Sequence, residues 1–222
     1  MRLSLFPTIA IVFVACPIVL ADDTSPLASR LTPLAKAHKG KVAVAVKNLF
    51  SGESYYLNAD EPMPTASLIK FPVLLELYQQ ASEGKVKLTD SVALKMDDKV
   101  PGSGILTDHF SEGASFPLRD AARLMIAFSD NTATNLVLDK VGIKAVNERM
   151  EAWGFPNTKI NAKVFRGSTT SVAPERTKKY GLGSTTAREM IGLFEDLETG
   201  NHFRPAVKQV VLGHLKKCDD KE

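Results

Sequence analysis

The sequence predicts a mixed α/β (α+β) fold, in which an antiparallel sheet is flanked by helices and joined to an all-helical lobe. Two observations lead to this prediction: an alternating apolar pattern within residues 41–57, and helical periodicity over much of residues 67–141. No repeat, low-complexity run or interdomain linker interrupts the 222 residues. We therefore expect one domain over residues 22–222.

The first predicted element of the sheet is a β-hairpin formed by residues 41–47 and 54–57. Its first strand alternates, with apolar positions at Val42, Val44 and Val46. Residues 48–53 contain Ser-Gly and make the turn. Because a lone two-stranded hairpin is marginally stable in water, it needs partners, and a helix predicted over residues 28–38 would pack on it.

The sequence of the middle of the chain predicts a group of helices. Residues 71–81 are apolar on nearly every side, which is typical of a helix buried in a core. Residues 118–128 carry an apolar stripe, and after a short break residues 132–141 continue as a second helix. A further helix is predicted over residues 204–217.

A serine and a lysine stand one helical turn apart at the start of the buried helix, where residues 67–70 read Ser-Leu-Ile-Lys. Unpaired N–H groups at a helix start suit an oxyanion, and burial would lower the pKa of Lys70 toward that of a general base. Ser67 and Lys70 are therefore a candidate nucleophile and proton acceptor. The structural alternative is a capping serine with a lysine that reaches solvent. A second Ser-x-x-Lys, at residues 82–85, includes a helix-ending glycine and is interpreted as a coincidence.

Residues 129–131 read Ser-Asp-Asn and separate two predicted helices. Beside a Ser–Lys pair, a Ser-x-Asn element can pass a proton to a leaving nitrogen, so the two elements together indicate a serine acyl-enzyme. Ser, Asp and Asn are also the usual helix caps. The structural alternative is that Asp130 or Asn131 only caps the second helix.

In this order and spacing, the two elements resemble those of the penicillin-recognising serine hydrolases, most closely the class A β-lactamases and their β-lactamase-like relatives. The resemblance includes Pro-Gly-Ser-Gly-Ile-Leu at residues 101–106 and a Thr-Thr helix start at residues 185–186. It extends from about residue 41 to residue 215. It implies a β-lactamase/transpeptidase-like fold.

The resemblance also implies roles for the matching residues. Ser67 would be the acylated nucleophile, and its backbone N–H would form half of the oxyanion hole. Lys70 would accept or relay the proton of Ser67, and Ser129 would protonate the departing lactam nitrogen. Asn131 would hold Lys70 and the amide side chain of the substrate, while Asp130 would brace the loop.

Gly104 lies in the segment that reads Pro-Gly-Ser-Gly at residues 101–104. The segment lacks the first glycine of a nucleophile elbow, which disfavours an α/β-hydrolase triad. We interpret Gly104 as a turn glycine of a loop over the cleft and assign it, with Asn131, to substrate binding.

The residue that activates the deacylating water is harder to identify. In class A enzymes it is a glutamate within an Arg-x-Glu-x-x-Leu-Asn pattern, which does not occur in this sequence. Glu175 is the best candidate, because it follows a proline in a loop ahead of residues 185–186. The alternative is a surface glutamate paired with Arg176 or Lys179, in which case the protein would acylate but release product slowly.

The third motif of the family, Lys-Thr-Gly on a strand across the cleft, does not occur in this sequence, and neither does Lys-Ser-Gly. In relatives that strand, two more strands and a closing helix would follow the helix at residues 204–217. We therefore expect the C-terminal strands to be missing from this chain. It is either truncated relative to a working enzyme or a degenerate relative that no longer turns over.

Our first hypothesis is a serine hydrolase that opens the β-lactam ring through an acyl-enzyme on Ser67, a β-lactamase that provides antibiotic resistance by β-lactam catabolism. An alternative within the same chemistry is a D-Ala-D-Ala peptidase or transpeptidase-like penicillin-binding protein that acts on cell-wall peptides. An alternative of another class is a non-catalytic binding module on the same fold. We expect no cofactor and a monomer.

Residues 1–21 predict a secretory signal peptide that ends in Val-Leu-Ala, so we expect a secreted or periplasmic protein without a stable membrane span. A transmembrane anchor is the alternative, because the apolar run is borderline in length. A lipoprotein site at Cys16 is disfavoured, because Phe13 suits it poorly and the apolar run continues beyond it.

Composition excludes several other classes of function. The net charge of +3 is too small, and the charges too scattered, for nucleic-acid binding. The four histidines show no ligand spacing, so no metal site is predicted. Only Cys218 would remain after cleavage at residue 21, which rules out an internal disulfide.

Overall fold

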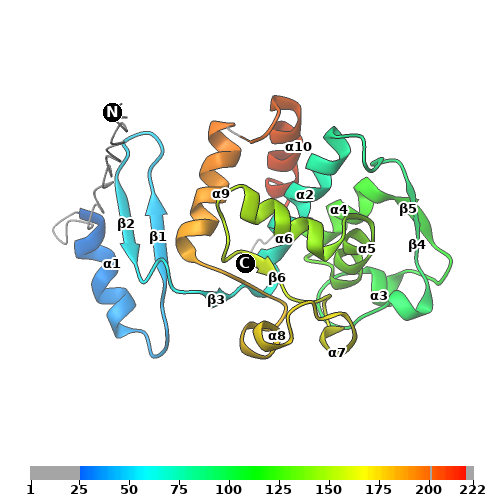
Figure 1. Cartoon of the computed structure of the whole chain (residues 1–222), viewed down its shortest axis with the longest axis horizontal. Coiled ribbons are helices and arrows are strands. Elements are labelled where there is room, and N and C mark those ends of the chain that lie inside the picture. Colours follow the sequence, from blue (N-terminus) through cyan, green and yellow to red (C-terminus); the bar gives the residue numbers. More distant parts are fainter. Residues whose placement is uncertain (1–25, 201, 219–222) are drawn as a thin grey trace, which may run out of the picture.

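The structure is a computed structural model in which residues 26–200 and 202–218 are described, so the predicted signal peptide lies outside the described residues. Figure 1 shows a small layer of one helix and a hairpin at one end of the molecule and a lobe of helices at the other. All paired strands are antiparallel. The predicted α+β class is confirmed.

The small layer contains the predicted hairpin and the helix that precedes it. Helix α1 (Pro26–Ala37) contacts β2 (Ser54–Leu57), which pairs with β1 (Val44–Lys47). The side-chain oxygens of Thr32 on α1 and Tyr55 on β2 lie 3.0 Å apart, and Tyr55 is buried. On the other side, β1 contacts α9 (Ala187–Thr199). Among the described residues, β1 and β2 pair only with each other.

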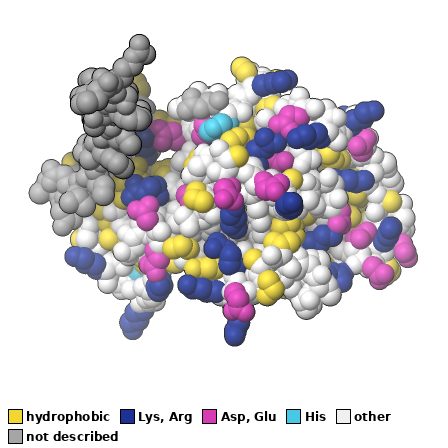
Figure 2. Space-filling model, viewed as in Figure 1, with side chains coloured by type: hydrophobic (Ala, Val, Ile, Leu, Met, Phe, Trp, Pro, Cys, Tyr) yellow, Lys and Arg dark blue, Asp and Glu magenta, His cyan; other side chains and the backbone are white. Residues whose placement is uncertain are grey.

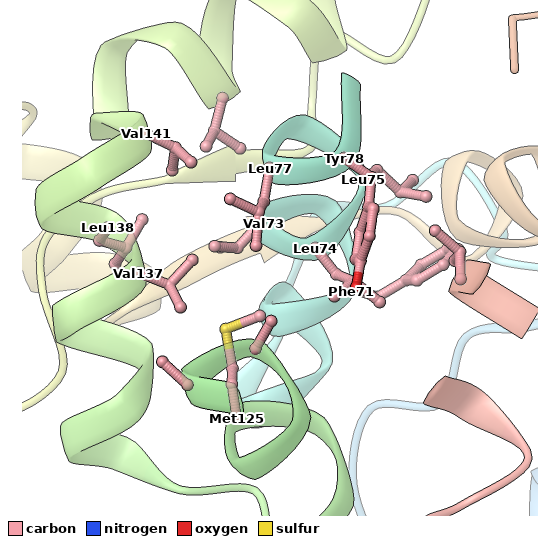
Figure 3. Close-up of a cluster of buried hydrophobic side chains, with 14 of the residues drawn as sticks. Phe71, Val73, Leu74, Leu75, Leu77, Tyr78, Met125, Val137, Leu138 and Val141 are labelled. Atoms are coloured by element: carbon pink, nitrogen blue, oxygen red, sulfur yellow. The ribbon is translucent and has the colours of Figure 1, made fainter. Parts of the chain in front are cut away.

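Helix α2 (Lys70–Ser82) forms the centre of the helical lobe, as its all-round apolar sequence predicts. It contacts α4 (Leu118–Ala127), α5 (Asn131–Val141), α6 (Ile143–Ala152) and α10 (Pro205–Leu215). In Figure 3, Val137 and Val141 of α5 point toward α2, and Met125 of α4 completes the cluster. Leu74 and Leu77 are fully buried, and each contributes about 1.5–3 kcal/mol to stability. This packing fixes the position of the N-terminal end of α2.

The remaining elements are short. The strands are β3 (Met63–Pro64), β4 (Ser91–Ala93), β5 (Ser115–Pro117), β6 (Lys159–Ile160) and β7 (Gly183–Thr185). The helices are α3 (Leu106–His109), α7 (Gly167–Thr170) and α8 (Pro174–Tyr180), with 3₁₀ turns at Ala66–Ile69 and Met96–Asp98. Strands β3, β7 and β6 form a small sheet in that order, and β4 pairs with β5. None of these short strands is predicted from the sequence.

The end of α2 and the start of α9 follow capping signals in the sequence. The Thr-Thr start is confirmed, because the side chain of Thr186 caps α9 by accepting a hydrogen bond from the Glu189 N–H at 3.0 Å. The second Ser-x-x-Lys lies at the opposite end of α2 from Ser67, since Ser82 is the last residue of that helix. Gly84, at φ +75°, then turns the chain away from α2.

The visible surface carries charges of both signs. On the face in Figure 2, Lys and Arg side chains alternate with Asp and Glu side chains. None of the helices in residues 26–200 and 202–218 is long and apolar enough to cross a membrane. The same part of the chain contains no group of three or more His, Cys, Asp or Glu residues arranged to hold a metal ion.

Candidate active site

Ser67 is held at the N-terminal end of α2 by a sharp change of chain direction. It is exposed within the 3₁₀ turn Ala66–Ile69, between β3 and α2. The preceding Ala66 has φ +44°, a conformation that residues other than glycine rarely adopt. The Thr65 N–H donates to the Gly183 carbonyl at 3.1 Å, so β7 fixes the approach to the turn. Backbone strain of this kind persists only where the surrounding structure imposes it, and it is common at functional sites.

Lys70 lies next to Ser67, and its side-chain nitrogen is within hydrogen-bonding distance of four oxygen atoms. Its Nζ is 3.2 Å from Ser67 Oγ, 3.0 Å from Ser129 Oγ and 2.9 Å from Asn131 Oδ1. The fourth oxygen is the Ser129 carbonyl, at 2.5 Å. An ammonium can donate hydrogen bonds to three of these oxygens. A neutral amine donates only two, but it has a lone pair that can accept the Ser67 proton.

Burial prepares Lys70 for the neutral state. The residue is only 3% exposed, and loss of hydration lowers its pKa from 10.5 to about 8, although the Asp130 carboxylate opposes the shift. A lysine with this pKa exchanges a proton readily near neutral pH, as a general base must.

Ser129 completes a triangle with Ser67 and Lys70. Its Oγ lies 3.0 Å from Ser67 Oγ, so a proton can move among the three side chains by short hydrogen bonds. Ser129 lies between α4 and α5 with φ +50°, a second strained non-glycine residue at the site. The structure thus brings together Ser67, Lys70, Ser129 and Asn131 from two segments about sixty residues apart.

Asp130 is 1% exposed and holds two segments together. Its Oδ1 accepts a hydrogen bond from the Ala133 N–H at 2.8 Å and caps α5. Its Oδ2 accepts from the N–H groups of Ile105 and Leu106, at 2.7 and 2.9 Å. Asp130 therefore caps α5, as the structural alternative predicts, but capping is not its only role. The same carboxylate also forms the bonds that a brace for the loop requires.

Gly104 is packed against Asp130, and no larger residue fits there. It has φ +121°, and a Cβ would lie 2.3 Å from Asp130 Cγ. Gly104 does not line the cavity beside Ser67. Neighbouring backbone ties this loop to the serine segment, because the Asn131 N–H donates to the Ser103 carbonyl at 3.0 Å. Ser103 Oγ also donates to the Ser129 carbonyl, at 2.8 Å.

A cavity of about 370 Å³ opens beside Ser67. One wall contains Ser67, Ser103 and Asn131, and the opposite wall comes from residues 162–165, Gly167, Thr177 and residues 181–182. Among the described residues that line it, the only ionisable side chain is Lys163, which forms an ion pair with Asp139. Ser67 therefore belongs to a polar wall and faces a largely apolar wall across the cavity.

Glu175 is not brought into this arrangement. It is exposed in the first turn of α8 and does not line the cavity. The pairing expected of a surface glutamate is not seen either. Arg176 donates to Ser184 Oγ and to the Asn157 carbonyl, and Glu175 forms no ion pair within the described chain. Its assignment as a base stays a prediction.

The opposite wall of the cavity was not predicted from the sequence. Val164 lies there, 7% exposed, and the buried side chain of Asn135 clamps it. Asn135 Oδ1 accepts from the Val164 N–H at 2.9 Å, and Asn135 Nδ2 donates to the Val164 carbonyl at 3.0 Å. One signal was available: Asn131 and Asn135 are four residues apart, so they share a face of α5. Two amide side chains on a buried face of a helix need hydrogen-bond partners, and these partners must come from another segment of the chain.

Comparison with known proteins agrees with this geometry. The model of the β-lactamase enzyme family matches residues 26–222. A β-lactamase of Proteus vulgaris is 22% identical over 202 residues, which are 84% of this chain and 67% of that protein. The β-lactamase PSE-4 of Pseudomonas aeruginosa is 29% identical over 122 residues, 54% of this chain and 42% of its own length. The chain thus spans about two fifths to two thirds of the length of such relatives.

Solved structures show the same fold. A β-lactamase from Sphaerobacter thermophilus superposes with a TM-score of 0.75 and 29% identity, covering 86% of this chain and 69% of that one. The structure of PBP-A gives a TM-score of 0.74 with 27% identity and covers 85% and 67% of the two chains. The β-lactamase/transpeptidase-like architecture expected from the motifs is therefore confirmed.

The pKa of Lys70 predicts how acylation of Ser67 depends on pH. Below about 8 the amine is mostly protonated and cannot accept a proton, so the rate should rise about tenfold per pH unit and level off above that pH. The measurement is the rate of adduct formation with penicillin by rapid-quench mass spectrometry across this range. A flat profile, or a midpoint near 10.5, would contradict the role of Lys70.

The contact between Gly104 and Asp130 predicts a large effect of Gly104→Ala. The added methyl group must displace the carboxylate that caps α5, so we expect a loss of about 3 kcal/mol in unfolding free energy and slower acylation. Gly113→Ala is the matched control, because φ there is +85° but nothing lies within 4 Å. It should cost about 1 kcal/mol through backbone strain alone. Equal losses in denaturant titrations of both variants would contradict the packing role of Gly104.

Proposed function

The chain belongs to the β-lactamase enzyme family, and on this premise we propose that it is a serine hydrolase that opens the β-lactam ring through an acyl-enzyme on Ser67. The observation that carries the proposal is the position of Lys70 Nζ, within hydrogen-bonding distance of both Ser67 Oγ and Ser129 Oγ. Nucleophile, base and proton donor then form one connected set.

In the first step, neutral Lys70 accepts the proton of Ser67 Oγ, which attacks the lactam carbonyl carbon. The negative charge that develops on the carbonyl oxygen is stabilised by the Ser67 N–H at the end of the buried helix. This N–H is one half of the oxyanion hole in the proposal. The carbon–nitrogen bond is still intact at this stage, and Lys70 carries the extra proton as an ammonium.

In the second step the carbonyl re-forms and the carbon–nitrogen bond breaks. The leaving nitrogen takes the proton of Ser129 Oγ, and Ser129 recovers a proton from the Lys70 ammonium, 3.0 Å away. The step leaves an ester on Ser67 and a neutral Lys70. In this proposal Asn131 holds Lys70 through its Oδ1 and orients the amide side chain of the substrate, as predicted. Asp130 holds the Ser129 segment in place, and Gly104 permits the close approach of that carboxylate.

Release of the acyl group requires a water molecule and a base. Glu175 remains our candidate base, although it is exposed and, unlike Thr177 of the same helix, does not line the cavity. A second candidate function is favoured by one observation: among the described residues that line the cavity, none is acidic. A site of this composition would hold its acyl group for long periods, as expected of a D-Ala-D-Ala peptidase or transpeptidase-like penicillin-binding protein.

The proposal extends to the setting in which the protein acts. A β-lactam or a cell-wall peptide would be its small-molecule partner, and a β-lactamase activity would provide antibiotic resistance. Both substrates lie outside the cytoplasm, which fits the predicted signal peptide and a secreted or periplasmic monomer. Support for a β-lactam partner comes from a mutant of PBP-A, whose solved structure is an acyl-enzyme complex with penicillin G.

Covalent labelling tests the proposed nucleophile. Incubation with benzylpenicillin should increase the intact mass by one whole penicillin molecule, because ring opening has no leaving fragment. Ser67→Ala should abolish the adduct, whereas Ser82→Ala, in the second Ser-x-x-Lys, should leave labelling unchanged. An adduct that survives in Ser67→Ala would refute the assignment. Reversible binding without any adduct in the native protein would favour the non-catalytic module.

Glu175→Gln separates the two candidate functions. If Glu175 activates the deacylating water, the variant should form the adduct at the native rate and lose it at least about 100-fold more slowly. Adduct decay followed by mass spectrometry after removal of excess penicillin is the measurement. Equally long-lived adducts in the native protein and the variant would reject Glu175 as the base and favour the penicillin-binding protein.

A further inference from the structure

One aromatic side chain at the cavity is not used by the chemistry proposed above. Phe165 lines the cavity together with Ser67, yet its side chain is 65% exposed. Its backbone has φ +53°, in the left-handed region that a bulky residue rarely adopts. An exposed aromatic residue in a strained conformation is unfavourable for stability on both counts, and strain of this kind is concentrated at ligand sites.

The loop that carries Phe165 is anchored on both sides. On one side, Val164 is clamped through its N–H and carbonyl by Asn135, and Lys163 forms an ion pair with Asp139. On the other side, the Arg166 guanidinium donates to the Asp97 carbonyl. The aromatic ring is therefore presented from a fixed loop.

The ring lies against the loop that faces it across the cavity. A Cβ built on Gly102 would be 3.3 Å from Phe165 Cε2 and 2.7 Å from Asn131 Nδ2. The aromatic edge is thus close to the amide that is proposed to hold the side chain of the substrate. Around it, the same wall is apolar and includes Val164 and Leu182.

From this juxtaposition we propose that Phe165 is a specificity-determining residue, the surface on which an apolar or aromatic acyl side chain of the substrate packs while Ser67 is acylated. The inference rests on the proposed function of Ser67 and adds the class of side chain that the site prefers. Burial of the exposed ring by an aryl group would supply the favourable contact that the free protein lacks. The Lys163 charge is already paired with Asp139, so this wall offers no free cation to an acidic side chain.

The test compares two penicillins that differ only in the acyl side chain, one with a phenylacetyl group and one with an acetyl group. Both keep the amide, so only the aryl contact changes. The native protein should be acylated about tenfold faster by the phenylacetyl compound. In Phe165→Ala the phenylacetyl rate should fall to the level of the acetyl compound, whose own rate stays near the native value. Phe165→Leu should restore part of the preference.

Phe50→Ala is the matched control, because Phe50 is fully exposed in the turn of the distant hairpin and should leave both rates unchanged. A native preference that persists in Phe165→Ala would overturn the inference while Ser67 remains the nucleophile. Equal loss of both rates in Phe165→Ala and Phe165→Leu would also overturn it, since that pattern indicates a purely structural role. If neither penicillin labels the native protein, the proposed function itself fails.

Discussion

The burial of the Lys70 side chain is the constraint on which the site depends. Lys70 is only 3% exposed, so its amine needs hydrogen-bond partners from the protein. These partners come from the turn before α2 and from the segment where α4 ends and α5 begins. The bonds to Ser67 and Ser129 therefore stabilise the fold and also hold together the three side chains of the proposed chemistry. The apolar packing around α2 removes water from the amine, so the core that stabilises the lobe also lowers the pKa of Lys70.

Three residues at the site and along the cavity have a strained backbone. Ala66, Ser129 and Phe165 all have positive φ, and each lies at a junction between elements or on a loop that lines the cavity. Strain of this size costs about 1–3 kcal/mol per residue, so each junction must be held by other contacts. Asp130 holds the second junction through three backbone N–H groups, and Asn135 clamps the loop that carries Phe165. The hydrogen bonds of these buried polar side chains thus offset the backbone strain at the site and along the cavity.

The sequence was sufficient for those parts of the site that local pattern encodes. A Ser–Lys pair at the start of an all-apolar helix, and a Ser-Asp-Asn break between two helices, could be found because helical periodicity surrounds both. The opposite wall could not be found in this way, because residues 161–182 have no periodicity and are positioned by long-range bonds such as those of Asn135. The same lack of local pattern explains why Glu175 was chosen only for its position in the sequence, after a proline and ahead of residues 185–186. It also explains why two-residue strands such as β3 and β6 were not expected.

The most direct test of the account is the pKa of Lys70 itself. NMR titration of protein labelled with ¹³C at the lysine side chains, with Lys70→Arg to assign the resonance, would report the charge of this amine without any substrate. The account predicts a pKa of about 8, far below that of the exposed lysines. A value near the ordinary 10.5 would make the neutral amine about 300-fold scarcer at neutral pH than a pKa of about 8 does, and it would contradict the role of Lys70 as the base that activates Ser67.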